Sequence, residues 1–172
     1  MKPPGLMRDG PIGLETRMRR SVANSLSWMA ADDGARLQVA ALKRTYSDPK
    51  RATHREVGPC QTYNCHGLTF ASRRTGISRS SEIQAILQDD GYARIDFREV
   101  MPGDIVIYRQ SASLGGEIHH SGIVVERPPP IDGIPTSPKV LSKWGHSHEV
   151  IHDVAYCEYY QNATIEYYRI AK

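Results

Sequence analysis

The sequence predicts an α+β protein, with helices in its first half and an antiparallel sheet in its second. Before Gly91, apolar residues recur at the helical period; after Gly91 they alternate or form short β-branched runs, as in strands. The chain has 172 residues, of which 40% are hydrophobic and 24% are charged. This size and composition are typical of one globular domain.

Four helices are expected, over residues 15–31, 35–46, 64–74 and 81–88. The first two rest on apolar residues at helical spacing: Met18, Val22, Leu26 and Met29, then Leu37, Ala40, Ala41 and Leu42. Asn64 is a good N-cap residue for the third helix, and Gly76 is expected to end it. Ser80 or Ser81 is expected to cap the fourth helix, which Gly91 ends.

Five strands are expected, over residues 92–97, 104–108, 118–126, 140–144 and 163–170. Residues 47–63 are polar and carry two prolines, so they are expected to form a loop. Further prolines between residues 127 and 138 indicate a long hairpin connection. Asp104 follows Pro-Gly and is expected to fix that turn through backbone N–H groups. Gly67 and Gly122 are expected to allow the third helix to pack closely on the sheet.

The charge of the chain is uneven. Residues 1–59 hold 11 Lys/Arg and 6 Asp/Glu, a net charge of +5, whereas residues 60–172 hold 11 and 13, a net charge of −2. A solvated helix face explains the basic half, and no nucleic-acid-binding motif accompanies it, so nucleic acid is not an expected partner.

No signal segment or membrane span is apparent in the sequence, which favours a cytoplasmic monomer; delivery by a secretion machine or a phage stays open. The three cysteines are an odd number, which argues against a disulfide framework.

Cys65 stands at the expected start of a helix. A thiol there meets the positive end of the helix dipole and unpaired backbone N–H groups, which favour the nucleophilic thiolate and can hold an oxyanion. A cysteine nucleophile also needs a base, usually histidine. His119 and His120 open an expected strand, and alternation places them on opposite faces, so one of them can face the thiol.

Three segments in order resemble a known family: Asn64-Cys65-His66-Gly67, Pro102-Gly103-Asp104-Ile105-Val106 and His120-Ser121-Gly122-Ile123. They are similar to the nucleophile, strand and base motifs of papain-like cysteine hydrolases, especially the compact bacterial NlpC and CHAP-type peptidases and amidases. The resemblance covers residues 58–145. It implies helices packed against an antiparallel sheet or half-barrel, Cys65 as nucleophile, His120 as base, and no cofactor.

The resemblance divides the chain into a catalytic core, residues 58–172, and a basic helical region, residues 1–57, that is part of the same domain or a lid on it. The implied substrate is a peptide, with peptidoglycan stem peptides as the family default. An intracellular protein or isopeptide bond, and a small amide or thioester, stay open as alternatives.

A third polar residue should orient the histidine. In papain-like peptidases an asparagine precedes a Trp-Gly pair by two residues; counting back from Trp144 gives Ser142, a departure from the family pattern. His146 shares the face of Ser142 if the strand continues, and His152 is a third candidate.

Residues just before Cys65 are candidates for the oxyanion hole or for substrate binding. The backbone N–H of Cys65 is expected to hold the oxyanion, helped by Gln61 or by the Tyr63 hydroxyl. Asn64 is most simply a helix cap. His66 is expected to point away from the site.

Two other classes of function compete with the enzyme. Zinc could draw on a set of Cys and His residues, although their spacings fit no common zinc motif; the set comprises Cys60, Cys65, His66, His146, His148, His152 and Cys157. A non-catalytic module could bind an acidic partner through the basic N-terminal helices.

Overall fold

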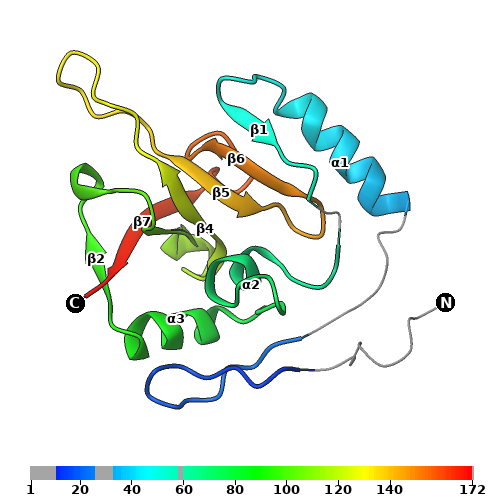
Figure 1. Cartoon of the computed structure of the whole chain (residues 1–172), viewed down its shortest axis with the longest axis vertical. Helices are drawn as coiled ribbons and strands as arrows, with labels where there is room; N and C mark the ends of the chain where they lie inside the picture. The colour runs from blue at the N-terminus through cyan, green and yellow to red at the C-terminus, as the bar shows by residue number, and fades with distance from the viewer. Residues whose placement is uncertain (1–10, 26–32, 58–59, 172) are drawn as a thin grey trace.

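The computed structural model describes residues 11–25, 33–57 and 60–171, and its central element is an antiparallel sheet (Figure 1). The strands are β1 (Ala52–His54), β2 (Tyr92–Ile95), β3 (Ile105–Gln110), β4 (Ile118–Glu126), β5 (Lys139–Lys143), β6 (Glu149–Asp153) and β7 (Ala163–Ile170). Their order across the sheet is β1-β6-β5-β4-β3-β7-β2, and every neighbouring pair is antiparallel. The predicted α+β class with an antiparallel sheet is therefore confirmed.

The helices are α1 (Asp33–Thr45), α2 (Cys65–Phe70) and α3 (Ser80–Asp89), with two 3-10 turns at Phe97–Glu99 and Ala112–Leu114. In Figure 1, α2 lies in front of β4 and β5, and α1 lies beside β1. Direct contacts join α2 to β4 and β5, and α3 to β2 and β4. Within the described residues, no helix is both long and apolar enough to cross a membrane.

Strand β3 is buried on both faces, because each face of the sheet carries its own core. Ile105 and Ile107 belong to the core that includes Ile83 of α3. Val106 and Tyr108 point to the other core, which includes Trp144 and Leu42 of α1, with Tyr46 packed against it. The sheet therefore separates an α3 side from an α1 side.

Each predicted strand is confirmed within about two residues of its ends, but β1 and β6 were not expected. β1 lies inside the predicted loop over residues 47–63. β6 lies between the predicted strands over residues 140–144 and 163–170, where no strand was predicted. The polar residues Glu149 and His152 of β6 are buried. Its sequence therefore lacks the alternation of apolar and polar residues that marks a strand with one solvent-exposed face. β2 ends early because Phe97–Glu99 forms a 3-10 turn capped by Asp96.

The predicted helix over residues 15–31 is wrong across residues 15–25, and its remainder lies outside the described residues. These residues form an extended hairpin with a Glu15–Ser21 bridge. The Thr16 hydroxyl donates to Asp89 of α3 at 2.8 Å, and the Arg17 N–H donates to Asp90 at 2.6 Å. Tertiary hydrogen bonds to α3 thus replace the internal bonds of a helix.

The other three helices are confirmed, with different ends. α2 stops at Phe70, not near residue 74, because Ser72 and Arg73 have positive φ and the Arg73 N–H turns back to Gly67 O at 3.0 Å. The N-cap position of α3 is Arg79 and not a serine, and its side chain makes no capping hydrogen bond; the Ser80 hydroxyl instead accepts from the Ile118 N–H at 2.9 Å.

Two turn predictions are also confirmed. Gly91 ends α3 with a φ of 75°. The Asp104 carboxylate accepts from the Met101 N–H at 2.7 Å, which fixes the Pro-Gly turn, and it also pairs with Arg169.

Candidate functional site

The Asn64 side chain fixes both the start of α2 and the neighbouring segment at Ile77. Its side-chain oxygen accepts from the Gly67 N–H at 2.9 Å and the Ile77 N–H at 3.1 Å. Its amide nitrogen donates to Ile77 O at 2.7 Å. The helix-cap prediction is confirmed, and both polar atoms of Asn64 serve to position Cys65.

The Cys65 thiol lies beside the peptide that joins His120 to Ser121. The backbone N–H groups of Ser121, His66 and Cys65 itself lie near enough to the sulfur to lower the thiol pKa. β4 pairs with β5 only from Ile123 onward, and α2 contacts both strands. The start of α2 therefore lies against β4 at Ser121, with backbone N–H groups of both elements near the sulfur.

Burial sets the protonation state of Cys65. The side chain is 7% exposed, and this burial raises the thiol pKa to about 11, although the three N–H groups and the Lys143 ammonium oppose the rise. At neutral pH the thiol is protonated. A preformed thiolate–imidazolium pair is thus not the resting state.

His120 is a buried neutral imidazole on the α1 side of the sheet. Its ring stacks on Tyr159 at 3.8 Å between centroids and meets the edge of Tyr108 at 5.1 Å. Neither ring nitrogen has a hydrogen-bond partner within the described residues, so no bond joins it to Cys65. Burial lowers its pKa well below the usual value, so the ring is neutral at pH 7 and keeps a nitrogen lone pair, and the same burial makes it a weaker base than a free imidazole.

His119 occupies a bulge in β4, which interrupts the expected alternation. Arg109 pairs with Ile118 while Tyr108 pairs with His120, so His119 has no residue opposite it. It is half-buried, with its Nε2 3.2 Å from Tyr159 O. His66 turns toward the sheet, where its Nδ1 lies 2.8 Å from the hydroxyl of Ser121, the residue after His120.

Of the three candidates for a third residue, Ser142 and His152 contact each other and not His120. Ser142 Oγ lies 2.8 Å from His152 Nε2. His152 Nδ1 lies 2.9 Å from Asp153 O, which can only accept, so the Nδ1 carries the proton and Ser142 donates to Nε2. Ser142 neighbours Gly122, two residues from His120 on β4.

His146 does not continue the strand that carries Ser142. β5 ends at Lys143, Gly145 has a φ of 57°, and the Ser147 N–H donates to Trp144 O at 2.9 Å. This tight turn exposes the His146 side chain. The expectation that residues 142, 144 and 146 share one face is therefore wrong at position 146.

A small pocket adjoins the start of α2 and gathers several predicted site residues. Its volume is about 50 Å³, and its lining includes Gln61, Tyr63, Asn64 and His146. Gln61 makes no hydrogen bond within the described part of the chain, so its amide is available to a ligand. The Tyr63 hydroxyl is already used, because it donates to Glu149 at 2.8 Å.

A buried charge cluster lies beside this pocket and was not predicted from the sequence. Glu149 is fully buried and accepts from Tyr63, from Arg55 at 3.0 Å and from Arg73 at 2.5 and 3.1 Å. The buried Lys143 ammonium donates to Cys60 O and Gly145 O, both at 2.9 Å, and lies 5.2 Å from the Tyr63 ring centroid. A positive charge is thereby held near Cys65.

The candidate zinc ligands do not converge. His148 bonds to His54 at 2.7 Å and to Ser147 at 2.7 Å, whereas His152 bonds to Ser142. Among residues 11–25, 33–57 and 60–171, no group of three or more His, Cys, Asp or Glu side chains is arranged to hold a metal ion.

No protein-family model matches the sequence, and a search of curated proteins finds no similar one.

The burial of the thiols predicts the order in which they react. Iodoacetamide at mildly alkaline pH is expected to label the half-exposed Cys60 well before Cys65 and Cys157, whose thiol pKa values burial raises to about 11. Mass mapping of timed samples measures the rates, with the denatured chain as control. Labelling of Cys65 as fast as Cys60 would contradict the described burial.

Proposed function

We propose that this chain is a cysteine hydrolase that cleaves an amide or peptide bond, with Cys65 as nucleophile and His120 as general base. The observation that carries the proposal is the place of Cys65 as the first residue of α2, where the capped helix start packs on β4 at Ser121, the residue after His120, and brings backbone N–H groups near the sulfur. Such donors stabilise negative charge on sulfur and on a substrate oxygen. The resemblance to papain-like hydrolases supports the same two residues.

The neutral resting state determines the proposed order of proton transfers. As the Cys65 sulfur bonds to the carbonyl carbon, His120 takes the thiol proton. The N–H groups of Cys65 and His66, with the nearby Lys143 ammonium, favour the negative charge that develops. His120 then gives the proton to the leaving amine, and water activated by His120 releases the acyl group. The thiol–imidazole hydrogen bond forms only with substrate bound, as in many apo enzymes.

The hydrogen-bonded pair of Ser142 and His152 is the proposed support for His120. Because Ser142 donates its proton to His152, its oxygen keeps lone pairs that can accept from a His120 N–H. The proposed substrates are peptides, with peptidoglycan stem peptides as the class that the resemblance implies.

The test is to trap the acyl-enzyme. The protein is treated with p-nitrophenyl acetate and with panels of peptide coumarin amides and peptidoglycan fragments, and acyl groups are located by mass mapping. We expect an acyl group on Cys65 in the natural sequence. Cys65→Ala should lose it entirely, and His120→Ala should acylate about 100-fold or more slowly.

Cys157→Ala is the matched control, because Cys157 is also a buried free thiol but lies in the α1-side core. It should acylate at Cys65 as the natural sequence does. Turnover that survives Cys65→Ala would overturn Cys65 as the nucleophile. A correctly folded natural protein that is never acylated at Cys65 and turns over nothing would overturn the proposal and leave a binding module as the function.

A further inference from the structure

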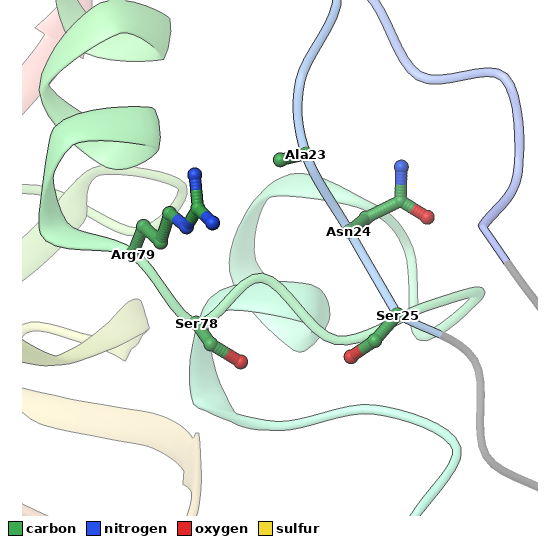
Figure 2. A pocket seen from close by; sticks show the side chains of 5 residues that line it. All are labelled: Ala23, Asn24, Ser25, Ser78 and Arg79. Carbon is green, nitrogen blue, oxygen red and sulfur yellow. The ribbon is translucent and has the colours of Figure 1, made fainter.

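A second, larger pocket adjoins the one at the start of α2. Its volume is about 200 Å³, and it is lined by Ala23, Asn24, Ser25, Ser78 and Arg79 (Figure 2). Ser25 and Ser78 also line the smaller pocket that holds Gln61 and Asn64. The two pockets therefore share a wall, and together they lead from the residue before Cys65 to Arg79.

Arg79 brings an uncommitted positive charge to this pocket. Its side chain is exposed, and within the described residues it makes no ion pair and no hydrogen bond. Figure 2 shows its guanidinium turned toward Ala23, across the pocket, with the Ser78 and Ser25 hydroxyls pointing toward each other nearby. These hydroxyls also have no hydrogen-bond partner among the described residues, so the pocket offers a cation and two neutral donors.

An acidic side chain, Glu82, contacts this wall through a backbone hydrogen bond and keeps its charge. Glu82 accepts from the Ala23 N–H at 3.1 Å. No ion pair joins it to Arg79 in the described part of the chain. The guanidinium therefore keeps its donors for an external group.

Hydrogen bonds within the protein hold the segments that form the walls of the pocket. Ser25 and Gly76 exchange two backbone bonds, at 2.9 and 2.8 Å. The Asn24 side chain bonds to Ile12, Val22 and Thr75. Asn64 holds Ile77, the residue before Ser78. A ligand would meet a preformed arrangement and would not have to order these segments.

We propose that this pocket binds a carboxylate of the substrate through Arg79, so that the chain acts on peptides or amides with an acidic group near the scissile bond. A guanidinium binds a carboxylate through two parallel N–H donors, and neighbouring hydroxyls can complete the site. One arginine balances the single charge of a carboxylate. This inference rests on the proposed function, because it makes the pocket at Arg79 a subsite joined through the smaller pocket to Asn64, the residue before Cys65.

The test measures binding separately from turnover. The ¹⁵N-labelled Cys65→Ala protein is titrated with the capped dipeptide Ac-Ala-Glu-NH₂ and with its uncharged isostere Ac-Ala-Gln-NH₂, and shifts of the Ser25, Ser78 and Arg79 N–H signals are followed. We expect the acidic peptide to shift these signals and to bind about tenfold or more tightly than the isostere. Arg79→Gln should abolish that preference.

Arg44→Gln is the matched control, since Arg44 is an exposed arginine on α1 without an ion pair among the described residues and away from the pocket. It should keep the full preference for the acidic peptide. Equal binding of the two peptides, or a preference that Arg79→Gln leaves intact, would overturn the inference.

Two further outcomes separate the possible causes of failure. Inorganic phosphate that shifts the same signals at lower concentration than the acidic peptide would identify a phosphate site and overturn the carboxylate assignment. Arg79-dependent binding of the acidic peptide, with no acylation of Cys65 in the natural sequence, would uphold the pocket and overturn the proposed hydrolase.

Discussion

Lowering the pH from about 7.5 to about 5 is expected to remove most of the stability of this chain. His66, His148 and His152 are buried, and burial lowers the pKa of each from 6.5 to about 4; it lowers the pKa of His120 as well. The folded chain therefore takes up these protons less readily than the unfolded chain. The stability that depends on these neutral rings is complete above about pH 6.5 and is lost as the pH falls toward 4.

The expected loss of folding free energy at pH 5 is comparable to the total stability of a domain. Each ring whose pKa falls to about 4 costs about 2 kcal/mol of folding free energy at pH 5, and three such rings cost about 6 kcal/mol. A domain of ordinary stability has about 5–15 kcal/mol in total. The acid form of this protein is therefore expected to be marginally folded or unfolded.

Urea unfolding followed by circular dichroism at several pH values measures the effect. His152→Gln should remove about 2 kcal/mol of the difference between pH 7.5 and pH 5. His146→Gln, at an exposed histidine, should remove none of it. A free energy of unfolding that stays constant over this range would show that the buried histidines are not held neutral.

Replacing Gly67 by alanine is expected to destabilise the fold by about 3 kcal/mol or more. A Cβ at this position would lie 1.8 Å from Thr75 O and 3.1 Å from the Tyr63 Cβ. The nearest atom is backbone, and the Thr75 segment is tied to Ser25 through its side chain. It cannot yield without disturbing the pocket wall that Ser25 and Ser78 form.

Gly13→Ala is the control, because no atom lies within 4 Å of a Cβ built there. It should leave urea unfolding unchanged. A Gly67→Ala protein as stable as the natural one would show that the Thr75 segment does not pack on α2 as described.

The close packing expected at Gly67 and Gly122 is present, but not where the sequence placed it. Gly67 of α2 meets the Thr75 segment, and Gly122 of β4 meets Val140 and Ser142 of β5. A glycine in the sequence indicates that another segment packs closely against it. Which segment this is depends on the topology of the chain.

The start of α2 was predictable because capping is local. Asn64 and Cys65 lie where the chain turns into a helix, and the β-branched runs of β3 and β4 are strong strand signals. The cluster of Glu149 and Lys143 was not predictable, because buried charges look like surface charges until their partners are known. The hairpin at residues 15–25 was missed for a similar reason: its hydrogen-bond partners on α3 are about 70 residues away in the chain.

The position of Glu149 has a consequence for how the chain matures. Its carboxylate joins Arg55, Tyr63 and Arg73, which precede it by 94, 86 and 76 residues. Contacts this distant in sequence form late in folding, because a long loop must close first. While the chain is being made, Cys65 emerges well before β6, so the thiol has neither its ammonium neighbour on β5 nor this carboxylate anchor. We therefore expect the nascent chain to hydrolyse nothing through Cys65 until β6 has joined the sheet, while its thiol, not yet buried, reacts with alkylating reagents faster than in the folded protein.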